Sequence, residues 1–161
     1  MKSFKQYLTE NISDTIQKIQ NFYNEFNAKY FNDELPHILH ISYQDMKDTI
    51  AEVDADTPDK KRSDPKKIQI VSLCFTSNYE FTDEQLIKFL LHEMIHIKLF
   101  VDGIIDTIGD PDHGKEFDEI RKRLIKETGY DIPLKETDDI FQNSGIEYYT
   151  DNFKRLKKDQ Y

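Results

Sequence analysis

The sequence predicts an α+β fold: a small, mostly antiparallel sheet packed on helices, with a central helix that carries a His-Glu-x-x-His motif. Apolar residues recur at helical spacing in residues 14–31, 83–102 and 115–128. Apolar and polar residues alternate in residues 37–43 and 68–75, a pattern typical of half-buried strands. The chain has 161 residues, a length that suits a single core. Together these observations favour one α+β domain.

The first 12 residues are predicted to form a short amphipathic segment that precedes the domain. Its apolar side chains fall on one helical face and are Phe4, Tyr7 and Leu8. Ser13 or Asp14 can then cap the first long helix, which runs to about Phe31. We therefore expect a helix break near residue 13, where the domain begins.

The stretch between the first two long helices is predicted to supply the sheet. One strand is expected at residues 37–43, a second short strand at 49–54 and the clearest strand at 68–75. Residues 54–67 contain two prolines and many charges of both signs, which is typical of an exposed loop. The order is thus helix, small sheet, then the motif helix.

The motif helix is expected over residues 83–102 and has signals at both ends. Thr82 and Gln85 fit a capping box, and Gly103 fits a C-cap. Apolar residues lie on most of its sides, which predicts a buried helix.

An Asp-rich loop, residues 104–112, is expected to lead to a third helix at residues 115–128 with Gly129 as its C-cap. Helical periodicity fades after that. We therefore place the domain at residues 13–130 and a C-terminal extension at residues 131–161.

His92, Glu93 and His96 form the motif. Histidines four apart share one helical face, so that their ring nitrogens can meet on one metal ion. Glu93 can reach a water bound to that metal, which is the pattern of zinc-dependent hydrolases. The alternative is a core helix whose histidines are satisfied by hydrogen bonds, but this leaves a buried Glu93 unexplained.

A catalytic zinc ion needs a third protein ligand. The candidates after the motif are Asp106, Asp110, Asp112, His113, Glu116 and Glu119. His113 is favoured because neutral imidazole suits zinc and because the preceding loop is long enough to turn the chain back. A glutamate ligand from the next helix, Glu116 or Glu119, is the open alternative. The metzincin pattern fails, since it needs Gly and His where this chain has Leu99 and Asp102.

Composition excludes several function classes. The net charge of −9 argues against tight nonspecific DNA binding by the whole surface. A single cysteine, Cys74, rules out an internal disulfide and fits a reducing compartment. No apolar run reaches transmembrane length, and no secretory signal follows the first lysines. We therefore expect a cytoplasmic protein without a membrane partner.

The motif and its surroundings resemble the SprT-like, Spartan-type metalloproteases. HEMIH is followed after about sixteen residues by H-G-x-x-F, which is His113, Gly114 and Phe117 here. A second match lies upstream and reads Asn27-x-x-Tyr30-Phe31-Asn32-x-x-Leu35. The resemblance covers roughly residues 22–125.

The resemblance implies a compact α+β domain in which His92, His96 and His113 bind Zn²⁺ and Glu93 is the catalytic base. Members are best known for cutting proteins crosslinked to DNA, so the implied partners are a protein substrate and DNA or a DNA-bound protein. This chain lacks the cysteines of a C-terminal zinc ribbon, which many relatives carry.

The N-terminus, M-K-S-F-x-x-Y-L-x-E, resembles the capsid-targeting peptides of T-even-type phages, which are cut after a Leu/Ile-x-Glu tripeptide. Leu8-Thr9-Glu10 matches that tripeptide. The resemblance implies a phage-encoded protein that acts in the host cytoplasm or is packaged in the virion.

The sequence thus predicts a zinc-dependent endopeptidase that hydrolyses peptide bonds with metal-activated water. The alternative is a non-catalytic, zinc-stabilised module that binds nucleic acid or protein. Its support is a C-terminal stretch with aromatics beside four basic residues, Lys154, Arg155, Lys157 and Lys158. Glu93 separates the two hypotheses, because a structural zinc site needs no base.

Overall fold

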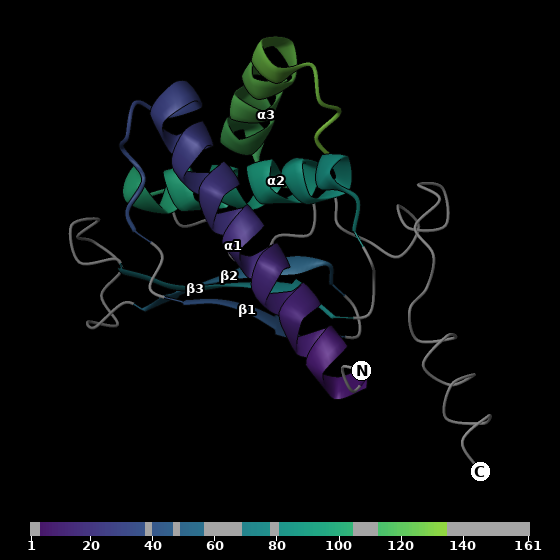
Figure 1. Ribbon diagram of the computed structural model, residues 1–161. Coiled ribbons are helices and arrows are strands. Elements are labelled where there is room, and N and C mark those ends of the chain that lie inside the picture. Colours follow the sequence, from purple (N-terminus) through teal and green to yellow (C-terminus); the bar gives the residue numbers. More distant parts are fainter. Residues whose placement is uncertain are drawn as a thin grey trace.

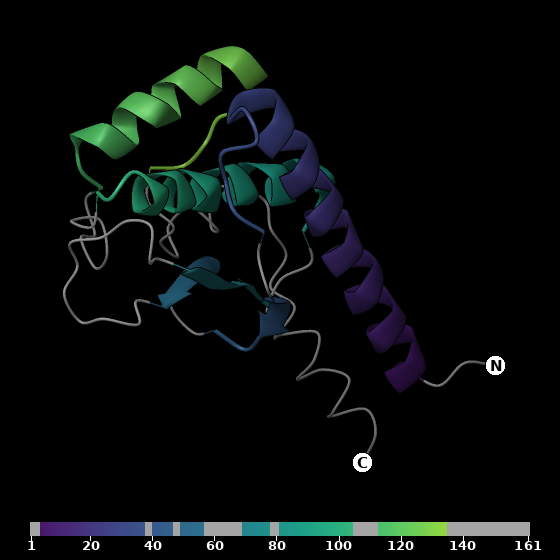
Figure 2. The ribbon, with the colours of Figure 1, turned by 90° about the vertical axis from the view of Figure 1, so that its left-hand side faces the viewer.

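The computed structural model describes residues 4–37, 40–46, 49–56, 69–77, 81–104 and 113–134. The elements in chain order are α1 (Phe4–Tyr30), β1 (His40–Gln44), β2 (Ala51–Asp56), β3 (Gln69–Thr76), α2 (Asp83–Val101) and α3 (Lys115–Thr128). Two views place α2 between the sheet on one side and α3 on the other, while α1 crosses beside them (Figure 1, Figure 2). The predicted α+β class with a central motif helix is confirmed.

Some predicted features lie outside the described residues. These are most of the loop predicted at residues 54–67, the Asp-rich stretch at 105–112 with its three aspartates, and the basic C-terminal stretch. Of residues 4–11 only the helical backbone is described, so the predicted amphipathic face of the N-terminal segment stays a prediction.

The sheet has three strands in the order β1-β3-β2. β2 pairs antiparallel with β3, whereas β1 pairs parallel with β3 and places Tyr43 opposite Phe75. The sheet is therefore mixed, where a mostly antiparallel one was expected. β1 and β2 run in opposite directions, but β3 inserts between them, and this insertion makes one of the two pairings parallel. β3 presents Leu73 and Phe75, both fully buried, to the core.

α1 is one continuous helix from Phe4 to Tyr30, so the break predicted near Ser13 is wrong. Residues 4–30 contain neither proline nor glycine, and nothing in this stretch forces a helix to stop. Ser13 and Asp14 are exposed, and a helix interior tolerates such residues when their side chains stay in solvent. The N-terminal segment is therefore the first part of α1, as far as it is described.

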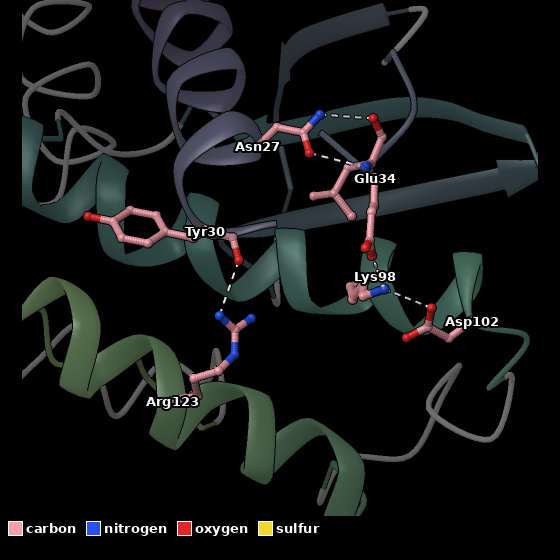
Figure 3. A network of polar contacts seen from close by, with 7 residues as sticks. Asn27, Tyr30, Glu34, Lys98, Asp102 and Arg123 are labelled. Carbon is pink, nitrogen blue, oxygen red and sulfur yellow. Dashed lines mark hydrogen bonds and ion pairs between the residues drawn. The ribbon is translucent and has the colours of Figure 1, made fainter. Parts of the chain in front are cut away.

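The chain leaves α1 through two residues in the left-handed region, Asn32 with φ 54° and Asp33 with φ 58°. Asn27 fixes the turn: its amide nitrogen donates to the carbonyl of Leu35 at 2.9 Å, and its amide oxygen accepts from the Leu35 N–H at 3.0 Å (Figure 3). These two bonds hold the Leu35 side chain in the core.

Polar side chains tie the end of α1 to the other helices (Figure 3). Lys98 of α2 contacts Glu34 at 2.5 Å and Asp102 at 2.9 Å. Arg123 of α3 donates to the Tyr30 carbonyl at 3.1 Å. The three helices therefore meet at this corner, where the C-terminal half of α3 is tied to the end of α1.

α2 begins as predicted. Gln85 N–H donates to the Thr82 hydroxyl and Thr82 N–H donates to the Gln85 side chain, which completes the capping box. Twelve of its nineteen residues are buried, as expected for a central helix. The helix ends at Val101 with Asp102 as the C-cap, one position before the predicted cap, and Gly103 follows in the left-handed region with φ 78°. Within the described part of the chain, no helix combines the length and the apolar character needed to cross a bilayer.

α3 spans the predicted residues, and Gly129, with φ 77°, ends it. The chain then turns back between α3 and α2 (Figure 2). We call residues 130–134 the return segment. Its Ile132 side chain is fully buried. The predicted C-terminal extension therefore begins with residues that pack against the core, Ile132 and Leu134.

Candidate metal centre

Three histidines meet where α2 faces the start of α3. His92 and His96 lie one helical turn apart on α2, and His113 immediately precedes the α3 N-cap. The distances between their ring centroids are 5.1, 4.8 and 4.9 Å. One nitrogen from each ring lies within 4.8 Å of the other two. The structure thus brings together the three predicted ligands, and their role as ligands remains a prediction.

The carboxylate alternatives are not part of this cluster. Glu116 and Glu119 lie on α3 with exposed side chains, and the cluster among the described residues holds histidines alone. Two further histidines, His37 and His40, are exposed and lie outside it.

The cluster fits a zinc ion in spacing and in chemistry. The Nε2 atoms of His96 and His113 are 3.1 Å apart. Two nitrogens bound at ~2.0–2.1 Å to one tetrahedral ion lie about 3.3 Å apart. Burial lowers the pKa of His92 to about 3 and that of His96 to about 4, and the charge of a neighbouring histidine adds to both shifts. Both rings are therefore neutral at physiological pH, the form that binds metal.

Phe117 packs against all three rings. Its centroid lies 4.8 Å from that of His92, 4.8 Å from that of His96 and 4.3 Å from that of His113. The side chain is fully buried and belongs to the first turn of α3. Phe117 therefore forms the apolar side of the cluster. It packs the three rings together and keeps water away from that side.

Comparison with known proteins identifies the family. The SprT-like family model matches residues 19–137. This chain belongs to the SprT-like family. The matched range includes the three histidines, Glu93 and the whole return segment, while the predicted domain bounds of 13 and 130 remain a prediction. A comparison with curated proteins found no match.

His113 of this SprT-like chain has a left-handed backbone, with φ 47°. Non-glycine residues rarely adopt this conformation, and it costs free energy that the surrounding structure must supply. Gly114 follows as the N-cap of α3 without a side-chain cap bond. The turn at His113 lets α3 start at Lys115 while the imidazole stays beside α2.

The orientation of His92 is set by the return segment. Its Nδ1 lies 2.8 Å from the carbonyl oxygen of Pro133. A carbonyl can only accept, so Nδ1 carries the proton and Nε2 carries the lone pair. Sequence reasoning missed this contact, because a backbone carbonyl leaves no residue-type signal. The only hint is an apolar run, Ile132-Pro133-Leu134, after the helix stop at Gly129.

Glu93 is buried in α2, next to His92, with 3% of its surface exposed. A buried carboxylate is costly in a helix that packs on apolar neighbours, so its presence indicates a partner or a function. The structure places this carboxylate in the same helical turn as two of the clustered histidines.

Proposed function

We propose that this SprT-like protein is a zinc-dependent endopeptidase. The observation that carries the proposal is the cluster of His92, His96 and His113, with neutral rings on α2, beside the buried carboxylate of Glu93. Three imidazoles plus a carboxylate that need not be a ligand suit a catalytic zinc, which keeps one position for water.

Each residue of the site has a separate role in the proposed hydrolysis of a peptide bond. The three histidines would hold the metal, with His92 and His113 brought to one place from α2 and from the start of α3. When bound, zinc polarises a carbonyl group and lowers the pKa of water towards ~7. The Glu93 carboxylate takes the proton from the attacking water and gives it to the nitrogen of the leaving amine. Phe117 excludes solvent from the far side of the rings.

The proposed substrate is a protein, and the proposed setting is DNA-bound protein in the cytoplasm, which is the host cytoplasm if the gene is phage-borne. The support is family membership. The net charge of −9 disfavours DNA binding by the whole surface, so that any DNA dependence must come from a local patch.

The test is cleavage of an unfolded protein by the zinc-loaded chain, with and without DNA. Glu93→Gln keeps the size of the side chain and removes the base. We expect it to bind zinc as the wild type does and to cleave at least about 100-fold more slowly. The matched control is Glu84→Gln, an exposed glutamate on the same helix that pairs with Lys88. Equal cleavage by the Glu93 variant would remove this residue from the mechanism.

The same experiment decides the alternative of a non-catalytic zinc module. Such a protein binds zinc and cleaves nothing, whatever residue stands at position 93. Structural zinc sites usually have four protein ligands, and the described residues bring three histidines to this site. This count favours the catalytic reading.

A further inference from the structure

The return segment is held at several points between α3 and α2 (Figure 2). Gly129 reverses the chain, and the Thr128 hydroxyl donates to the Leu124 carbonyl at 2.7 Å while it accepts from the Tyr130 N–H at 3.1 Å. Ile132 then buries its whole side chain. These contacts make the segment part of the packed core.

Two successive carbonyls of this segment bond to two different helices. The Ile132 carbonyl accepts from Arg121 Nε of α3 at 2.6 Å. The Pro133 carbonyl accepts from His92 Nδ1 of α2 at 2.8 Å. Because the two carbonyls belong to neighbouring residues, the bond from Arg121 restricts the backbone that presents the second carbonyl to His92. Proline at 133 adds to this, since its ring fixes φ.

Arg121 is itself held in place. Its Nη1 lies 3.2 Å from Asp118 Oδ1, and its side chain is 19% exposed. Asp118 also pairs with Lys122 at 2.6 Å, and Lys122 has a side chain that is 71% exposed. Arg121 is thus the residue of this trio that joins α3 to the return segment.

We propose that Arg121 is a positioning residue for the metal centre. It holds the return segment so that the Pro133 carbonyl fixes the Nδ1–H tautomer of His92 and directs the Nε2 lone pair to the metal. The inference rests on the metal-binding part of the proposed function and is independent of peptidase activity. Groups that orient a ligating histidine in this way typically change metal affinity about 10–100-fold when they are removed.

The positive charge of Arg121 makes it possible to tell a positioning effect on metal affinity from a charge effect. Removal of a positive charge near a cation site would by itself strengthen metal binding. The positioning role predicts the opposite, because a free His92 ring loses its orientation. A lower affinity in a variant without the charge therefore cannot be a charge effect.

The experiment compares Arg121→Met, Arg121→Lys and the matched control Lys122→Met, which removes a neighbouring ion pair with Asp118 but leaves the Ile132 contact. Zinc affinity is measured by competition with a chromophoric chelator. The tautomer of His92 in the metal-free chain is read from histidine ring ¹H–¹⁵N correlations, assigned with His92→Gln. Thermal unfolding of the metal-free proteins shows whether each variant is folded.

We expect Arg121→Met to bind zinc about 10-fold or more weakly than the wild type, with a mixture of His92 tautomers. Arg121→Lys keeps the charge but not the planar guanidinium group, and its zinc affinity should lie between those of the wild type and Arg121→Met. If the methionine variant does not fold, the lysine variant is used to test the proposal. Lys122→Met should match the wild type in both measurements. Unchanged affinity and tautomer in both Arg121 variants, or a loss of thermal stability alone, would overturn the proposal.

Failure of this inference can be told from failure of the proposed function. A wild-type chain that binds zinc but cleaves no protein refutes the peptidase and leaves the affinity test intact. If the wild type binds no zinc, the proposed function fails, and with it the assignment of Arg121 to a metal centre.

Discussion

The Nε2 atom of His113 lies 3.1 Å from the Nε2 atom of His96, although the two are 17 positions apart in the chain. This contact joins the start of α3 to the middle of α2. His113 makes this contact from a left-handed backbone, with φ 47°. The backbone at this position therefore carries strain that serves the position of the ring.

The strain at His113 can be measured apart from its imidazole. His113→Ala and His113→Gly both remove the ring, but only glycine adopts a positive φ without cost. We expect the metal-free glycine variant to be more stable than the alanine variant by roughly 1 kcal/mol. Urea unfolding of the two proteins gives the difference. An alanine variant as stable as the glycine variant would show that the chain relaxes out of the left-handed region.

Asn27 is predicted to stabilise the turn after α1. Asn27→Ala removes two hydrogen bonds to Leu35 and leaves both backbone groups of a buried residue to find other partners. We expect a loss of about 1–3 kcal/mol in the free energy of unfolding. The control is Asn24→Ala, whose side chain pairs with Gln20 on the exposed face and should cost little. Similar values for the two variants would contradict this role of Asn27.

Phe117 is predicted to support both the fold and the cluster. Phe117→Leu leaves a cavity beside three imidazole rings, and we expect a loss of roughly 1–3 kcal/mol together with weaker zinc binding. The comparison is Phe22→Leu, the same change at a half-buried ring that stacks on Phe26 of α1. That variant should lose some stability and keep its zinc affinity. Equal zinc affinity in the two variants would mean that the packing of Phe117 does not hold the rings.

Cys74 reports on the packing of β3. Burial raises the pKa of its thiol, and the side chain is almost fully enclosed. Thiol reagents attack the thiolate, so a raised pKa shifts labelling to higher pH. We expect little reaction with an aromatic disulfide reagent at pH 7 in the folded protein and rapid reaction in urea. Fast labelling at pH 7 without urea would contradict the buried position of β3.

Local chemistry made the motif helix and the helix after it predictable. The Thr82–Gln85 capping box and the helix stop at Gly129 act within a few residues of each end, so α2 and α3 begin where expected and end within one residue of the prediction. The start of α1 was missed because Ser13 can serve either as an N-cap or as an exposed residue in the interior of a helix. The parallel β1–β3 pairing was missed because it depends on which strand, distant in the sequence, lies beside β1 in the folded protein.

The candidate site, too, was predictable from the sequence only in part. The four-residue spacing fixes the relation of His92 to His96, and the loop length made His113 a natural third member. The Pro133 carbonyl and the bond from Arg121 to Ile132 could not be inferred, because backbone acceptors exist at every residue and only the folded return segment selects two of them.

The most direct test of the metal centre is the zinc content of the folded chain, measured by native mass spectrometry after incubation with a small excess of zinc. We predict one zinc ion per chain for the wild type and for His40→Ala, which removes an exposed histidine outside the cluster. We predict a much lower occupancy for His96→Ala. A wild-type chain without zinc, or a His96 variant with full occupancy, would contradict the account.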